Sequence, residues 1–152
     1  MIAALLGRER KTDAPIAVEG YASLFAISDH SGDVIRAGAF RASLARLKGP
    51  LPLLVQHEPR LRAGAWLDVK EDGRGLYVKG AILPDEPGAA KARRLIARGV
   101  DGLSIGFVPI VARSHTRGRV LEEIDLIEVS LVTHPMQPLA RLTLARGNSR
   151  AL

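Results

Sequence analysis

The chain has 152 residues, 47% of them hydrophobic and 25% charged, which is enough for one domain with a core of its own. It contains no cysteine, which excludes disulfide frameworks, thiol nucleophiles and cysteine-ligated zinc. Its formal net charge is +6, but the basic residues are spread along the chain and only 4% of residues are aromatic. A solvated basic surface is therefore favoured over a nucleic-acid partner. No apolar run approaches the roughly 20 residues that span a bilayer, so we expect a cytoplasmic protein without a membrane partner.

The first half of the chain is predicted to consist of strands joined by turns, with one short helix. Phe40, Leu44 and Leu47 recur at helical spacing, and Gly49-Pro50 ends that helix. The segment 72–75 (Asp-Gly-Arg-Gly) is a hairpin signal, because glycine adopts the positive φ that tight turns need. Glu58-Pro59 is expected to break the strand before it. The predicted elements are strands over 16–25, 34–35, 51–55, 63–69 and 75–83 and a helix over 38–47.

The second half repeats this mixture. A helix is predicted over 89–98, with Gly99 as its C-cap, and strands over 103–112, 120–133 and 139–144. About seven strands and two short helices predict a β-rich α+β fold, a compact and mostly antiparallel β-barrel with short flanking helices. We expect one domain over 16–145, an N-terminal tail or edge strand over 1–15 and a disordered tail over 146–152.

Three features could carry chemistry. Ser104 lies in a strand-like run, on the face shared with Gly106, which leaves space beside it for an approaching substrate backbone. His57 continues the period-two phase of Leu53 and Val55 and is therefore expected to point inward, as a general base or as a satisfied core histidine. The alternative for Ser104 is a small polar residue hydrogen-bonded to a neighbouring strand.

The run 123–132 places carboxylates inside a further strand. Both of its phases are mostly apolar, so Glu128 or Asp125 would need a partner, either a histidine or one of the many arginines. Nucleophile, base and acid are the parts of a serine hydrolase triad, which is one hypothesis among several. There is no GxSxG elbow, and the remaining histidines form no HExxH pattern, so neither an α/β-hydrolase nor a metal or other cofactor is expected.

Taken together, these segments resemble the prohead (capsid maturation) proteases of tailed phages and phage-like gene transfer agents, which are related in fold to the herpesvirus assembly proteases. The similarity spans most of residues 16–140, and the order and spacing of the segments are its specific part. The matching segments are 19–22 (EGYA), 32–35 (GDVI), 38–40 (GAF), 53–59 (LLVQHEP), 75–78 (GLYV), 102–107 (GLSIGF) and 128–135 (EVSLVTHP).

The resemblance implies a serine endopeptidase. His57 matches the histidine of the family and Ser104 its nucleophile. Herpesvirus enzymes use a second histidine as the third member, whereas the corresponding strand here offers Glu128, with Asp125 as the fallback and His134 ranked after both. Backbone N–H groups would hold the oxyanion, with Gly106 and Arg141 as candidate oxyanion or substrate-binding residues.

The implied substrate is the scaffolding segment of the major capsid protein, and the protease itself is a second candidate substrate. The implied place is the inside of the assembling prohead, and a homodimer is an implied possibility because herpesvirus proteases depend on dimerisation. The main alternative is a non-catalytic capsid assembly factor with the same fold. A basic nucleic-acid-binding module and a hydrolase of small substrates are further alternatives, although open strand ends fit an extended peptide better.

Overall fold

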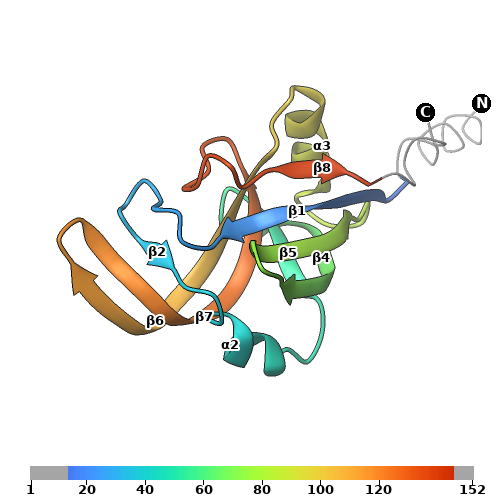
Figure 1. Ribbon diagram of the computed structural model, residues 1–152. Helices are drawn as coiled ribbons and strands as arrows, with labels where there is room; N and C mark the ends of the chain where they lie inside the picture. Colours follow the sequence, from blue (N-terminus) through green and yellow to red (C-terminus); the bar gives the residue numbers. More distant parts are fainter. Residues whose placement is uncertain (1–13, 146–152) are drawn as a thin grey trace, which may run out of the picture.

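The computed structural model describes residues 14–145, so the predicted tails lie outside it, except for residues 14 and 15 (Figure 1). Within these residues the chain forms eight strands in one sheet and two short helices, which confirms the predicted β-rich class. None of the described helices is long and apolar enough to cross a membrane. The elements are β1 (Ile16–Leu24), β2 (Val34–Ile35), α2 (Arg41–Ala45), β3 (Leu51–Val55), β4 (Glu58–Glu71), β5 (Gly75–Ile82), α3 (Ala89–Ala97), β6 (Gly102–His115), β7 (Gly118–Val132) and β8 (Leu142–Leu144).

Strand β7 organises the sheet. The strand order is β2-β7-β3-β4-β5-β1-β8, and β6 pairs with the other edge of β7. The β6–β7 pair is a long antiparallel hairpin that extends away from the rest of the sheet (Figure 1), whereas β2 and β3 run parallel to β7. The two ends of the sheet meet at a bridge between Gly102 and Arg141, with hydrogen bonds from the Leu103 N–H to the Ala140 carbonyl (2.9 Å) and from the Leu142 N–H to the Asp101 carbonyl (2.6 Å), and no ladder joins them within the described residues. The sheet is therefore curled but is not a closed barrel.

The core fixes which face of β6 and β7 is buried. Leu103 pairs with Leu131, and Ile105 pairs with Val129, so these four side chains share the inner face. Trp66 on β4 is 1% exposed and donates its Nε1–H to the Val129 carbonyl at 3.1 Å. Because side chains alternate along a strand, Ser104, Gly106, Glu128 and Ser130, which lie next to these four residues, face the outside of the sheet. Other fully buried core residues are Phe40, Leu53, Leu76, Ile82, Leu121, Ile124, Val18, Val55 and Val78.

The start of β4 differs from the sequence prediction. The strand begins at Glu58 and not at residue 63, and it contains Pro59. Val55 pairs with Glu58 across a two-residue turn in which Gln56 (φ 53°) and His57 (φ 60°) are both left-handed. Pro59 is tolerated because the β3–β4 ladder is irregular there and β5 pairs with β4 only from residue 64 onward, so no regular ladder bond is lost.

The loop between β1 and β2 is anchored to the tip of the β6–β7 hairpin. Arg119 donates from Nε and Nη2 to the two carboxylate oxygens of Asp33, at 3.0 and 2.7 Å. Gly32 is left-handed (φ 89°), and a Cβ built on it would lie 2.1 Å from the Arg117 carbonyl oxygen, so only glycine fits this approach. The Arg119 guanidinium holds the pKa of the buried Asp33 carboxyl below its ordinary value.

We predict that Asp33→Asn lowers the free energy of unfolding by about 1–2 kcal/mol at pH 7, because a charge-assisted hydrogen bond is replaced by a neutral one. A carboxyl with a lowered pKa in the folded state stabilises the fold above its unfolded pKa, and this contribution is lost as pH falls through the folded value. The difference between wild type and variant in urea unfolding should therefore shrink toward acid pH. An equal difference at every pH would contradict this account.

Candidate active site

Three strands bring the candidate residues to one place on the outer face of the sheet. Ser104 on β6 pairs with Ser130 on β7, which pairs in turn with Leu54 on β3. Residues directly opposite one another have Cβ atoms about 4.5–5.5 Å apart and point to the same face. Two residues earlier on β7, Glu128 pairs with Gly106 and lies on this same face. Ser104, Ser130 and Glu128 therefore form one cluster, at the end of the sheet where β3 turns into β4.

His57 reaches this cluster from the turn after β3. Its Nδ1 lies 2.5 Å from Glu128 Oε1, and its backbone N–H donates to Ser130 Oγ at 3.1 Å. Glu128 is 6% exposed, whereas the His57 side chain is 42% exposed. The prediction that His57 continues the strand phase and points inward was wrong, because the left-handed turn ends the alternation and directs the ring to the outer face.

The pairing with Glu128 determines the protonation behaviour of His57. The hydrogen bond and charge of Glu128 raise the pKa of His57 above its ordinary value, and partial burial of the ring opposes the shift. With Nδ1 bonded to the carboxylate, the proton-accepting nitrogen available to a substrate is Nε2, which has no hydrogen-bond partner within residues 14–145. A buried carboxylate that orients a half-exposed imidazole is the arrangement expected of an acid and base pair.

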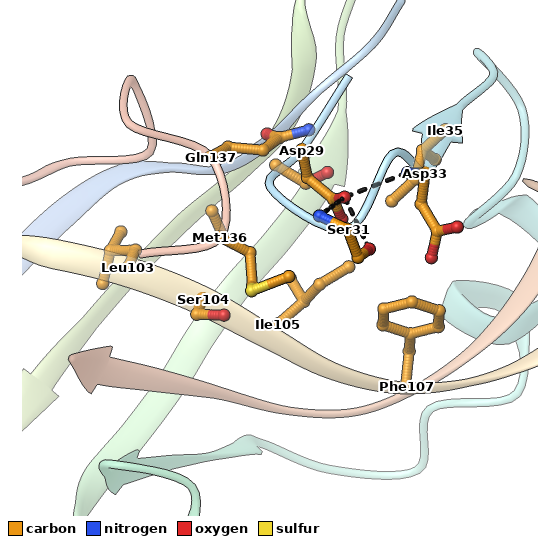
Figure 2. A pocket seen from close by; sticks show the side chains of 12 residues that line it. Asp29, Ser31, Asp33, Ile35, Leu103, Ser104, Ile105, Phe107, Met136 and Gln137 are labelled. Carbon is orange, nitrogen blue, oxygen red and sulfur yellow. Dashed lines mark hydrogen bonds between the residues drawn. The ribbon is translucent and has the colours of Figure 1, made fainter. Parts of the chain in front are cut away.

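Ser104 and His57 line different clefts, and the described residues show no hydrogen bond between them. Ser104 lines a cleft of about 180 Å³ between β6 and the loop after β1 (Figure 2), where Asp29 and Ser31 form one wall. His57 and Glu128 line a second cleft, on the β3–β4 side, and Phe107 borders both. The Ser104 hydroxyl has no hydrogen-bond partner within the described residues. The predicted alternative, in which this hydroxyl bonds to a neighbouring strand, is not what the structure shows.

The other candidates lie apart from the His57 ring. The Asp125 carboxylate accepts from Ser43 (3.3 Å) and from Arg46 (3.4 Å), so it takes the arginine partner that the sequence left open for it. His134 is exposed in a shallow cleft that Arg141 also lines. The guanidinium of Arg141 donates to Asp101 (2.8 Å) and to the Pro138 carbonyl (2.7 Å).

Gly106 has a different use from the predicted one. A Cβ built on it would lie 2.2 Å from Glu128 Oε1, so the missing side chain makes room for the Glu128 carboxylate. Sequence reasoning assigned this space to a substrate backbone. The residue that it missed entirely is Ser130, whose hydroxyl donates to Glu128 Oε2 at 2.6 Å. The sequence feature that could have indicated Ser130 is a second small polar residue inside an apolar strand, two positions after a candidate acid.

Among residues 14–145 there is no group of three or more histidine, aspartate or glutamate side chains arranged to hold a metal ion.

The model of a protein family described as caudovirus prohead serine protease matches residues 5–150. The chain belongs to this family. The prohead protease of Enterobacteria phage HK97 is 36% identical over 123 residues, covering 77% of this chain and 54% of that protein. The chain thus spans about half the length of this relative. The capsid scaffolding protein of Suid herpesvirus 1 is 33% identical over 79 residues, which are 52% of this chain and 15% of that protein.

Solved structures show the same fold at low sequence identity. The bacteriophage T4 capsid assembly protease superposes with a TM-score of 0.65 at 14% identity, over 78% of this chain and 82% of that one. The protease of Kaposi's sarcoma herpesvirus, solved with a hexapeptide phosphonate inhibitor, gives a TM-score of 0.60 at 16% identity, over 88% of this chain and 66% of that one. The prediction of a herpesvirus-protease-like fold is confirmed.

Adding one methyl group at Gly106 should separate Glu128 from His57. In Gly106→Ala the new Cβ overlaps the flexible end of the Glu128 side chain, so we expect the carboxylate to move and the backbone to stay. The pKa of His57, measured by NMR titration, should fall toward its ordinary value because the contact that raises it is weakened. Gly73→Ala is the matched control, since a Cβ there meets nothing within 4 Å. If the pKa of His57 is unchanged in Gly106→Ala, the contact between Glu128 and His57 does not depend on the space beside Gly106.

Proposed function

We propose that this prohead protease family member is a serine endopeptidase that cleaves the scaffolding segment of its major capsid protein during prohead maturation. The observation that carries the proposal is the contact between His57 Nδ1 and Glu128 Oε1, formed beside Ser104 on the outer face of the sheet. The names of the relatives support the place of action, since they are a prohead protease, a capsid assembly protease and a capsid scaffolding protein. We further propose that the chain acts inside the assembling shell.

In the proposed mechanism, His57 Nε2 takes the proton from the Ser104 hydroxyl as Oγ attacks a peptide carbonyl. The tetrahedral intermediate collapses to an acyl-enzyme, and the same imidazolium gives its proton to the leaving amine. Water, deprotonated by His57, then releases the acyl group. Glu128 holds the tautomer with the proton on Nδ1 and stabilises the imidazolium that forms at each step.

The oxyanion needs donors that do not move during the reaction. We propose that backbone N–H groups near Ser104 supply them, as in other serine proteases. Arg141 is the weaker candidate, because its guanidinium already donates to Asp101 and to the Pro138 carbonyl. Gly106 contributes by leaving room for the Glu128 carboxylate, and its backbone stays a candidate for contact with the substrate.

An extended peptide fits the open edge of β6. Leu103 directs its N–H away from β7, to the Ala140 carbonyl, so Ile105, two residues on, presents its backbone groups at the same edge. Within the described chain β6 is paired in a ladder only with β7, so the edge at Ile105 is free for main-chain pairing. The cleft beside it (Figure 2) could then receive a side chain of the peptide. These features favour a polypeptide substrate over a small molecule.

The deciding experiment is co-expression with the cognate major capsid protein, followed by intact-mass analysis of both chains. We expect the wild type to remove a defined N-terminal segment from the capsid protein, and Ser104→Ala and His57→Ala to leave it at full length. The exposed residues Ser114 and His115 offer matched controls, whose alanine variants should cleave like the wild type. If the capsid protein stays at full length in every sample while shells still form, the proposal of a protease is wrong. The chain would then be a non-catalytic assembly factor of the same fold.

The pH profile tests the role assigned to Glu128. His57 accepts a proton only when neutral, so its raised pKa sets the acid limb of kcat/KM. Glu128→Gln should lower that pKa, moving the acid limb to lower pH, while the plateau falls by about 10³–10⁴-fold because the imidazolium loses its counter-charge. Asp125→Asn is the control, because the Asp125 carboxylate lies on the same strand but contacts Arg46 and not His57. This variant should leave the acid limb in place. If the acid limb of kcat/KM does not move in Glu128→Gln, Glu128 does not act as the acid that orients His57.

A further inference from the structure

Ser130 connects both members of the proposed acid and base pair. Its hydroxyl donates to Glu128 Oε2 at 2.6 Å, while Glu128 Oε1 lies 2.5 Å from His57 Nδ1. The same hydroxyl oxygen accepts the backbone N–H of His57 at 3.1 Å. Ser130 is 0% exposed. One buried hydroxyl thus contacts the side chain of the acid and the backbone of the base.

The contact with Glu128 limits how the carboxylate can turn. The terminal torsion of a glutamate side chain is broad, so a single hydrogen bond at Oε1 leaves the plane of the carboxylate weakly defined. A second bond at Oε2 fixes that plane. It also satisfies an oxygen that burial withholds from water, since Glu128 is only 6% exposed.

The contact with His57 supports an uncommon backbone conformation. Gln56 and His57 are consecutive non-glycine residues with φ of 53° and 60°, a left-handed conformation that is unfavourable for residues with a side chain. The turn is held by the Gln56 N–H, which donates to the Leu131 carbonyl (2.9 Å), and by the His57 N–H on Ser130. A hydroxyl can accept this N–H and donate to a carboxylate through the same oxygen atom.

We propose that Ser130 is a positioning residue for the proposed protease, holding the Glu128 carboxylate and the His57 turn in register with Ser104. It pairs with Ser104 on one side and with Leu54 on the other, so the strands that supply nucleophile, acid and base meet at this residue. Ser130 is not an alternative nucleophile, because it is buried and its proton is committed to Glu128. The inference rests on the proposed function, and its test separates the two.

The chain offers a close structural control in Ser43. Ser43 is 3% exposed, accepts the backbone N–H of Leu126 at 2.9 Å and donates to Asp125 Oδ1 at 3.3 Å. It therefore has the same two kinds of partner as Ser130, a backbone N–H and a carboxylate, but both of its partners lie on β7 and it does not contact His57. Ser43→Ala and Ser130→Ala remove the same buried group, and a purely structural role predicts the same result for both.

The experiment compares the wild type, Ser130→Ala and Ser43→Ala by urea unfolding, by cleavage of the capsid protein across pH and by NMR titration of His57. We expect similar losses of stability in the two variants. Only Ser130→Ala should lose about 10²-fold or more in kcat/KM, because small misplacements of catalytic groups have effects of that size. Only Ser130→Ala should also lower the pKa of His57 and shift the acid limb to lower pH, because Glu128 is no longer held against the ring.

Besides Glu128, the charged residues beside the His57 ring are Glu58, which follows it in the chain, and Arg62, which lines the same cleft. No variant changes either of them.

If Ser130→Ala does not fold, Ser130→Cys fills nearly the same volume with a weak donor and should give the same shift in the pKa of His57. Equal activity, acid limb and His57 pKa in the Ser130 and Ser43 variants of a cleaving enzyme would overturn the positioning role alone. A wild type that cleaves nothing, with the pKa of His57 still lowered in Ser130→Ala, would overturn the proposed function alone.

Discussion

The site depends on one buried carboxylate with two hydrogen-bonding tasks. Glu128 is almost entirely removed from water, and each of its oxygens is satisfied by one partner, the His57 ring at Oε1 and the Ser130 hydroxyl at Oε2. An ionised carboxylate in such a place is stable only if both oxygens have partners. Gly106 leaves the space, Ser130 fixes the plane, and the turn after β3 presents the ring. The local structure around the site follows from these requirements.

Alternation of apolar and polar residues was enough to predict most of the fold. It located seven of the eight strands nearly at their observed bounds and both helices, because each element has a buried face that leaves a period in the sequence. It failed at the start of β4, where Gln56 and His57 form a left-handed turn without the glycine or asparagine that normally indicates one. The error in the orientation of His57 followed directly from this, since a strand phase cannot be extended through a turn.

The candidate site was only partly predictable. The sequence showed that Glu128 and Asp125 each needed a partner, and it limited the choice to a histidine or an arginine. Deciding which carboxylate meets His57 requires the register of β7 against β3 and β6, which comes from the whole sheet. The place of Ser130 was hidden for the same reason. Glu128 is two residues away on the same strand, but His57 is near Ser130 only because strands from distant parts of the sequence are adjacent.

The parallel pairing of β3 with β7 has a consequence for how the chain folds. His57 and Glu128 are 71 positions apart in the sequence, and β7 follows β3 with three strands and a helix between them. Contacts between distant segments form late, because the entropy of closing a long loop must be overcome first. The imidazole therefore gains its carboxylate only when β7 has paired with β3. A nascent or partly folded chain carries Ser104 and His57 but not the contact with Glu128, so the proposed activity would depend on the completed pairing of β7.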